Sequence, residues 1–389
     1  PAGNFAPEGT NQTGMAIQNM KYSLDLTNIF TDDRDDSDDL TYSVVGDDGV
    51  ATAALNIDGK TLEYTPVAAD VNNAVVITVT ATDTEAATSA AVTITLNVAS
   101  GFAGGTGTEG DPWQISTPLH LNNIRNYPGE ASSGKYFILV NDIDMAPYLG
   151  ADGPEYNDGA GWRPIGDSYG TAFQGTFLGN DKTISNLRIN RPDQSYIGLF
   201  GYAYEHRVEN LFLADVSISG KGFMGSLIGT SSIGSVSNVA VTGTVSGNYQ
   251  TVGGFVGTNT TGSTINNSYA CVNVTVTGAA PNVGGFVGSN SGGIIQNCYN
   301  TGTVNGSSDV GCFTGLNSGT IQDCYTVGVV SGSNRVGAFL GTSISGTIIN
   351  SYYDSTVSGR SDTGKGEPRT TAEMLQQSNY TGWDFAAVW

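Results

Sequence analysis

Apolar and polar residues alternate cleanly in two segments near the start of the chain, Val75–Ala81 and Ala91–Val98. Leu40–Val45 and Thr61–Thr65 are two shorter segments of the same kind. Alternation with a period of two, without a helical period between the segments, is typical of strands with one buried face. We therefore predict a small β-sandwich for residues 1–99, and a glycine-rich linker at 100–107.

A different pattern, an internal repeat, fills the rest of the chain. One mark is a glycine-bounded apolar segment, which occurs at Ile197–Gly201, Met224–Gly229, Val252–Gly257, Val283–Gly288, Val310–Gly315 and Val336–Gly341. The other mark is an amide or carboxylate, which recurs at Asn186, Asn210, Asn238, Asn267, Asn297, Asp323 and Asn350. An aromatic residue follows most of these two positions later, at Phe212, Tyr269, Tyr299, Tyr325 and Tyr352. Steps of 24–30 residues are in the range of solenoid repeats.

Stacked short strands explain this repeat. One coil cannot bury its own apolar side chains, whereas coils stacked roughly 4.8 Å apart bury them in continuous columns. The fold class is therefore all-β, with a parallel β-helix or β-solenoid over 108–389. We expect the asparagine column to form a side-chain ladder, weakest at Asp323, which accepts but cannot donate when ionised. We expect the glycines to permit corners with positive φ and close approach of turns.

Short helices are predicted at both ends of the solenoid. Thr117-Pro118 is a capping pair for a helix over 118–127, and a strand follows at Lys135–Val140. Thr370–Glu373 is a capping box, with Trp383, Phe385 and Trp389 beyond it. Helices there would cover the open ends of the sheet. The solenoid thus divides into opening coils (108–196), repeats (197–359) and a closing cap (360–389).

Charge narrows the range of partners. The net charge is −21 and only 13% of residues are charged, which argues against nucleic acid and anionic membranes but leaves cations, glycans and proteins open. Acidity that merely keeps the protein soluble is the simpler explanation. No apolar run reaches the roughly 18 residues that span a bilayer. The chain begins at Pro1, so we expect any export signal or lipid anchor to have been removed.

Four cysteines lie in the repeats, at Cys271, Cys298, Cys312 and Cys324. Other repeats have small residues at these positions, so we expect reduced, core-filling thiols. A bridge between Cys298 and Cys324, which are equivalent in neighbouring coils, is the alternative.

The repeat resembles the GLUG motif of bacterial surface proteins. The glycine-bounded segments carry this resemblance, together with Asn267-Ser-Tyr269, Asn297-Cys-Tyr299 and Asn350-Ser-Tyr352. The resemblance implies a secreted or surface-anchored bacterial protein, often adhesin-like, with no common activity. Residues 20–98 resemble cadherin-like or Ig-like modules, through the aspartate cluster before Leu40-Thr-Tyr42 and the strands Ile77–Asp83 and Val92–Val98.

A calcium site is one candidate function of the N-terminal region. Its possible ligands are carboxylates, at Asp32, Asp33, Asp35, Asp36, Asp38, Asp39 and Asp83. Crowded carboxylates repel each other, and a hard cation would relieve that repulsion. Asp83 is included because related cadherin-like modules bind calcium near domain junctions. A solvated acidic loop is the alternative, and calcium is the only cofactor considered.

A glycan-contact site is the second candidate, because the irregular stretch 148–177 contains Tyr148, Tyr156, Trp162 and Tyr169. Trp162 also fits a packed position. Asp142 and Asp144 sit together in Asn-Asp-Ile-Asp and would point the same way on a strand. Catalysis by such a pair is weighed against turn chemistry, which we favour.

The predicted function is therefore a non-catalytic, adhesin-like protein at the bacterial cell surface or outside the cell. Its expected partners are extracellular glycans or host-matrix proteins, and a monomer is expected. A carbohydrate-active lyase or glycoside hydrolase and a purely structural spacer are the alternatives. The step from fold to function is analogy.

Overall fold

The computed structural model describes residues 4–18, 20–56, 58–71, 73–278, 281–386 and 388, with backbone only for Ala68. The chain folds as two compact units, Pro1–Ala103 and Gly104–Trp389. The division falls inside the predicted linker 100–107. Among the described residues, no helix has the length and apolar character needed to cross a membrane.

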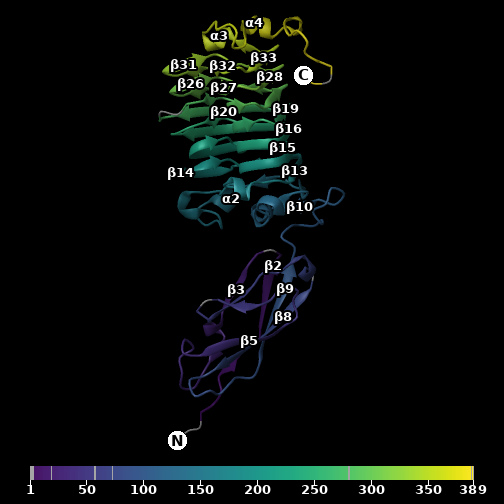
Figure 1. Ribbon diagram of the computed structural model, residues 1–389, viewed down its shortest axis with the longest axis vertical. Coiled ribbons are helices and arrows are strands. Elements are labelled where there is room, and N and C mark those ends of the chain that lie inside the picture. The colour runs from purple at the N-terminus through teal and green to yellow at the C-terminus, as the bar shows by residue number, and fades with distance from the viewer. Residues whose placement is uncertain are drawn as a thin grey trace. The chain divides into compact units, whose positions relative to one another are not determined.

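The first unit is a β-sandwich (Figure 1). Its strands are β1 (Glu8–Gly9), β2 (Gln12–Ile17), β3 (Tyr22–Asp25), β4 (Phe30–Thr31), β5 (Thr41–Asp47), β6 (Ala54–Leu55), β7 (Thr61–Tyr64), β8 (Ala74–Thr82) and β9 (Val92–Ala99). One sheet has the order β2-β9-β8-β5 and another β3-β7-β6, while β1 pairs with β4. The alternation along β8 and β9 places Ile77, Val79 and Ile94 in a single core with Leu62 and Tyr64. The predicted sandwich is confirmed.

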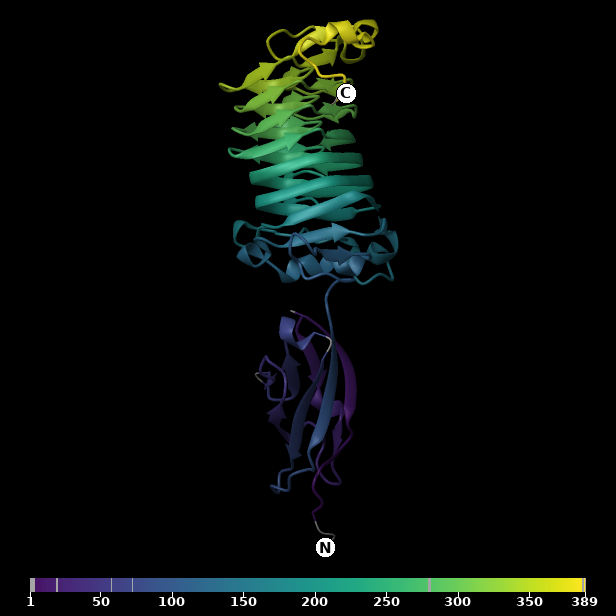
Figure 2. The ribbon, with the colours of Figure 1, turned by 90° about the vertical axis from the view of Figure 1, so that its right-hand side faces the viewer.

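The second unit is one continuous sheet wound into coils, which Figures 1 and 2 show as stacked layers. Its first strands are β10 (Trp113–Ile115), β11 (Tyr136–Leu139), β12 (Ile143–Asp144), β13 (Thr176–Ser185), β14 (Arg188–Ile197), β15 (Phe200–Met224) and β16 (Ile228–Gly247). The middle coils contain β17 (Val252–Gly253), β18 (Val256–Thr260), β19 (Ser263–Asn266), β20 (Tyr269–Val276), β21 (Val283–Gly284), β22 (Val287–Ser291), β23 (Ile294–Gln296), β24 (Tyr299–Asn300) and β25 (Val304–Asn305). The last are β26 (Ser308–Gly311), β27 (Thr314–Asn317), β28 (Thr320–Gln322), β29 (Tyr325–Thr326), β30 (Val330–Ser331), β31 (Asn334–Gly337), β32 (Leu340–Ser343), β33 (Thr347–Ile349), β34 (Tyr352–Asp354) and β35 (Glu367–Arg369).

Parallel pairing in strict register stacks equivalent residues, and one column can be followed through nine coils. Its members are Trp113, Phe137, Phe177, Val208, Val236, Ile265, Ile295, Ile321 and Ile348. A second column stacks the phenylalanines of the glycine-bounded segments: the rings of Phe255 and Phe286 are 4.6 Å apart, and those of Phe286 and Phe313 are 5.0 Å apart. The parallel β-solenoid predicted from the repeat is confirmed.

A buried amide ladder runs through the interior of the coils. Asn259 Nδ2 donates to Asn290 Oδ1, and Asn290 Nδ2 donates to Asn317 Oδ1, each over 2.9 Å. Neighbouring glycines make room for these side chains, because a Cβ on Gly319 would lie 2.7 Å from Asn290 Nδ2. The ladder therefore depends on an asparagine in one coil and a glycine in the next.

The predicted ladder positions have a different main role. All seven residues from Asn186 to Asn350 adopt positive φ, between 45° and 58°. Side-chain bonds between successive members occur at Asn238–Asn210 (3.0 Å) and Asn350–Asp323 (3.1 Å), whereas Asn297 donates to Asn266 and Asn186 to Asp144. Short polar side chains tolerate the left-handed region, so these residues turn the corners of the coil. A ladder along this column is therefore interrupted.

The repeat glycines were expected to permit those corners and close approach of turns, and the first of these expectations is wrong for the glycine-bounded segments. Gly198, Gly225 and Gly253 do not have the positive φ of the corner residues. They are instead pressed against the neighbouring coil, since a Cβ on Gly198 would lie 2.8 Å from Gly225 O. The glycines therefore allow close packing of coils, and the asparagines supply the turns.

Both ends of the solenoid carry the predicted helical segments. At the first coil, α1 (Pro118–Asn123) begins after Thr117, whose side chain accepts from His120 N, and it buries Leu121. Another short helix, α2 (Ala146–Leu149), follows β12. After the last coils come α3 (Ser355–Ser358) and α4 (Thr371–Met374), and α4 has the predicted capping box.

The closing cap differs from its prediction in one respect, because α4 is a single turn and Leu375 beyond it is 84% exposed. Trp383 covers the last coils instead: its ring lies 5.9 Å from that of Tyr352, and its Nε1 donates to Asn350 O. Trp389 lies outside the described residues.

The cysteines are unpaired in the described structure, and three of them are buried: Cys298, Cys312 and Cys324. Burial raises the pKa of the Cys312 thiol to about 11. Cys271 is exposed, contrary to the expectation of a core position, because β20 alternates and Val272 and Val274 take its inward sites.

Candidate ligand-binding surface

Two of the four residues predicted to contact glycans belong to the core of the opening coils. Trp162 is fully buried, its Nε1 donates to Leu199 O, and the Arg125 guanidinium lies 4.0 Å from its ring centre. Tyr148 is also buried, and burial raises the pKa of its hydroxyl to about 12. Tyr156 is half-buried, and Tyr169 is 64% exposed. Of the predicted set, Tyr169 is therefore the residue most available to a ligand.

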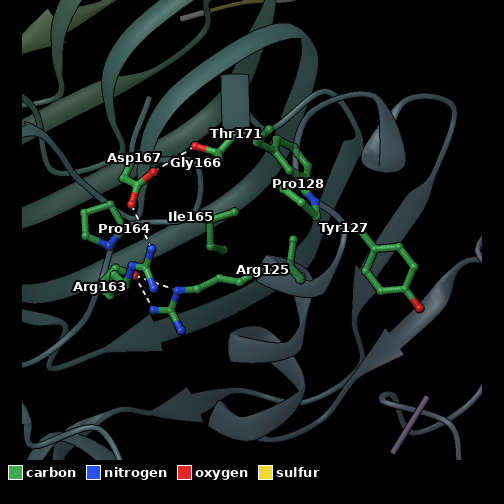
Figure 3. Close-up of a pocket in the computed structure, with 11 residues that line it drawn as sticks. Arg125, Tyr127, Pro128, Arg163, Pro164, Ile165, Gly166, Asp167 and Thr171 are labelled. Atoms are coloured by element: carbon green, nitrogen blue, oxygen red, sulfur yellow. Dashed lines mark hydrogen bonds and ion pairs between the residues drawn. The ribbon is translucent and has the colours of Figure 1, made fainter. Parts of the chain in front are cut away.

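Arg125 holds the backbone of Arg163, six residues before Tyr169 in the chain, and Figure 3 shows this contact. Its Nε donates to Arg163 O over 3.0 Å, and a second guanidinium nitrogen donates to the same carbonyl. Burial lowers the pKa of Arg125 to about 10, which leaves it charged at neutral pH. The guanidinium therefore clamps the backbone at Arg163 from inside.

A small pocket opens beside this clamp and continues into a wider hollow. The pocket has a volume of about 90 Å³ and is lined by Arg163, Asp167 and Thr171 among others. The hollow has about 450 Å³ and is lined by Arg163, Pro164, Asp167, Gln194, Ser195 and Tyr196. Asp167 is held by Arg163 at 2.9 Å and by Thr171 at 2.8 Å, and these bonds lower its pKa. Hydrogen-bond donors and acceptors thus both line the hollow.

Five aromatic rings gather next to the hollow, and we name Tyr169, Tyr196, Tyr202, Tyr204 and Phe223 the aromatic patch. Tyr169 meets Tyr202 and Tyr204 edge-on, with ring centres 5.8 Å and 5.5 Å apart. Tyr196 lies 5.6 Å from Tyr202 and is stacked on Phe223 at 5.2 Å. The four residues other than Tyr169 are half-buried, so their rings are anchored and still reach the surface.

Tyr196 and Phe223 have positive φ, 62° and 49°. They immediately precede Ile197 and Met224 of a stacked column, and in later coils the residues that precede this column are polar, as at Asn282 and Asp309. The left-handed region costs a bulky residue about 1–2 kcal/mol, whereas asparagine and aspartate tolerate it. The last opening coil and the first repeat thus keep aromatic rings at a corner where the backbone disfavours them.

Sequence reasoning found Tyr169 but missed the other four members of the patch. The available signal was Tyr202-x-Tyr204, since residues two apart on a strand point to the same face. That signal lay inside a repeat whose aromatics were interpreted as packing residues.

The acidic residues considered for catalysis cap backbone groups. Asp142 Oδ1 accepts from Thr183 N, and Asp144 Oδ1 accepts from Ala146 N and Asn186 Nδ2. These bonds lower the pKa of Asp144. In the later coils, Asp309 binds Arg335 at 2.6 Å and also Ser308. Each of these carboxylates has a structural role.

The predicted calcium ligands are not assembled into one set. Asp32 caps Arg34 N and Asp35 N, Asp35 accepts from Thr84, and Asp38 pairs with Lys60 at 2.9 Å. Asp83 accepts from Asn4 and Ala87 N, and Asp33 lies 3.9 Å from Arg34. The other two, Asp36 and Asp39, belong to the same turn. Within the described ranges, no three acidic, histidine or cysteine side chains are placed to hold a metal ion. Local turns and ion pairs use most of these carboxylates.

Comparisons with known proteins identify a family motif, two relatives and one solved structure. A family model described as the GLUG motif matches residues 279–305, which confirms the predicted resemblance for that coil. An Evansella cellulosilytica protein provisionally described as a Gly-rich membrane protein is 32% identical over 74% of this chain. Halomucin of Haloquadratum walsbyi is 36% identical over 39% of this chain.

The chain spans 44% of the length of the first relative and 2% of that of halomucin. Among solved structures, an endo-fucoidan hydrolase of glycoside hydrolase family 107 has a TM-score of 0.21 at 19% identity, over 26% of this chain and 14% of that enzyme. A similarity this slight carries no argument about fold or activity. The chain is thus an all-β solenoid protein with a GLUG motif. It is similar to a protein described as a Gly-rich membrane protein and to halomucin.

Proposed function

We propose that this chain is the ligand-binding part of an adhesin-like protein that acts outside the cell, without catalysis, on glycan or protein ligands. The aromatic patch carries the proposal. Half-exposed rings on a rigid scaffold, beside a hollow with a few polar groups, are typical of binding sites. The carboxylates of the solenoid discussed above are engaged by backbone or side-chain partners, which favours binding over acid–base chemistry.

The proposed place of action is the surface of a bacterium or the extracellular space. The membrane description of one relative supports this location. The composition agrees with it, since residues 222–334 contain no lysine or arginine and only two carboxylates, Asp309 and Asp323. A surface rich in serine, threonine and asparagine favours neutral partners over nucleic acid.

An array of glycans and extracellular-matrix proteins tests the proposal. The labelled chain is expected to bind at least one class of ligand and to leave it intact. Absence of binding to all glycans and all matrix proteins on the array would contradict the proposal and favour a structural spacer. Release of new reducing ends from a bound polysaccharide, lost in Asp142→Asn or Asp144→Asn, would show a carbohydrate-active enzyme instead.

A further inference from the structure

We infer that the aromatic patch and the hollow beside it bind a segment of an uncharged polysaccharide. This inference rests on the proposed function and specifies both the ligand class and the site. It concerns the boundary between the opening coils and the first repeats, where η6 (Tyr169–Thr171), the end of β14 and both ends of β15 contribute rings.

The shape of the patch fits the faces of sugar rings. The C–H groups of a pyranose are apolar on one face, and an aromatic ring offers a flat, electron-rich partner for them. Tyr169 stands nearly perpendicular to Tyr202, with an interplanar angle of 89°, whereas Tyr196 and Phe223 are parallel within 9°. The rings therefore form a step against which a chain of sugars can lie.

The hollow supplies the hydrogen bonds that apolar contact cannot. Arg163 and Asp167 are planar groups already oriented by their ion pair at 2.9 Å, and Gln194 adds an amide. Each can bond two neighbouring hydroxyls, with donors and acceptors both present. A volume of about 450 Å³ is within the usual range of small-ligand pockets.

The backbone at the corner gives an independent reason to regard the patch as a site. Tyr196 and Phe223 occupy left-handed positions that Asn282, Asp309 and Arg335 occupy later in the solenoid. Asparagine or aspartate would relieve that strain and would keep the corner polar. Strained residues concentrate at binding sites, so rings retained there point to a ligand.

Charge selects an uncharged ligand. Arg163 is paired with Asp167, and Glu205 lies close enough to Tyr204 to raise the pKa of its hydroxyl. Burial likewise raises the pKa of Tyr202, so both hydroxyls stay protonated at neutral pH and can donate. With a net charge of −21 on the chain, a polyanion would be repelled.

Binding of the whole chain to soluble polysaccharides, measured by affinity electrophoresis and calorimetry, tests the inference. Dextran, galactomannan and mixed-linkage β-glucan serve as neutral probes, and heparin and alginate as anionic ones. We expect binding to at least one neutral probe. Tyr169→Ala and Tyr196→Asn should each weaken it about thirtyfold, as removal of a central aromatic contact does.

Two features of the variants separate binding from folding. Tyr196→Asn places a residue suited to positive φ at the corner, so the melting temperature should hold while binding is lost. Tyr249→Asn is the matched control: this tyrosine is 50% exposed one coil further along, against Lys221 at 5.7 Å, and its loss should leave the affinity unchanged.

The inference is overturned if both patch variants bind like the unchanged chain, or if the anionic probes alone are bound. In those cases the chain still binds a ligand, so the proposed function stands and the site or the ligand class is wrong. Binding only to a protein on the matrix array likewise overturns the inference alone. Absence of any ligand overturns both.

Discussion

The opening coils and the later repeats are built on the same columns but use them differently. The column that begins with Trp113, Phe137 and Phe177 continues as valine and isoleucine up to Ile348. The corner column changes in a different way, from Tyr196 and Phe223 to Asn282 and Asp309. In the first coils, aromatic residues thus lie in the central column and at the corner. In the later coils they form ordered stacks, such as Phe255 to Phe339.

This difference separates stability from recognition within one fold. In the repeats, identical side chains of neighbouring coils stack on or hydrogen-bond to each other. The stacks and ladders therefore leave few groups for contact with a ligand. In the opening coils the irregular segment before β13 interrupts the repetition, and side chains such as Tyr169 and Arg163 point to solvent. Variants that break one region should therefore leave the function of the other intact.

The largest expected effect is loss of a ring from the phenylalanine stack. Phe286 is fully buried between Phe255 and Phe313, so Phe286→Ala leaves a cavity and should lower the free energy of unfolding by about 3–5 kcal/mol. Urea denaturation measures this change, with Tyr249→Ala as an exposed control expected within about 0.5 kcal/mol. Equal losses from both variants would show that the stack is not the source of stability.

A smaller loss is expected from the buried amide ladder. Asn290→Ala removes the bonds to Asn259 and Asn317 and leaves Asn259 Nδ2 without its acceptor inside the coil, which should cost about 2–3 kcal/mol, whereas Asn317 Oδ1 keeps its bond from Gly319 N. Asn334, which is exposed and bonds Ser308 at 3.4 Å, is the matched position for the same substitution. If Asn334→Ala is as destabilising as Asn290→Ala, the ladder contributes nothing special.

His206, in β15, gives the solenoid a pH dependence. It is buried, Nε2 is 3.3 Å from Ser231 Oγ, and burial lowers its pKa to about 4, from 6.5. The unfolded chain therefore binds the proton more readily, and stability present above pH 6.5 is lost as the pH falls toward 4. The loss should be about 1.4 kcal/mol per pH unit, or about 2 kcal/mol by pH 5.

Comparison with His206→Gln isolates this contribution. Carboxylates with lowered pKa values, such as Asp144 and Asp309, lose their contribution below their ordinary pKa of 3.8, outside this window. The difference in unfolding free energy between the two proteins should therefore change between pH 7 and 5. If the unfolding free energies of the two proteins change in parallel with pH, the His206 imidazole is not buried and neutral.

The sequence was sufficient to predict the structural elements that the repeats and the alternation specify. The spacing of Asn186 to Asn350 gave the coils, and the alternation in Val75–Ala81 gave a sandwich strand. The patch was harder to predict, because it joins Tyr169 to Tyr202 through a loop whose path no periodicity specifies.

The predicted positions form only an interrupted ladder, and the buried ladder at other asparagines was missed for a definite reason. Asparagine suits both a left-handed corner and an amide ladder, and both kinds occur in the coils of Asn259, Asn290 and Asn317. The distinguishing sign is the glycine that makes room for the amide, as Gly319 does for Asn290. Corner asparagines such as Asn297 show no such partner pattern and are followed by the aromatic column.

The smallest expected effect tests that distinction at Asn297, whose φ is 54° and whose Nδ2 donates to Asn266 Oδ1 over 3.1 Å. Asn297→Ala and Asn297→Gly both lose this bond, so the difference between them reports the backbone alone. Glycine adopts positive φ freely, whereas alanine pays about 1 kcal/mol there. We therefore expect Asn297→Ala to unfold at lower urea than Asn297→Gly, by about 1 kcal/mol. At Asn290, which is not among the residues with positive φ, the order should not favour glycine, because neither variant restores the ladder and glycine adds unfolded-state entropy. The same order at both positions would mean that corner and ladder asparagines act alike, and the separation of their roles would fail.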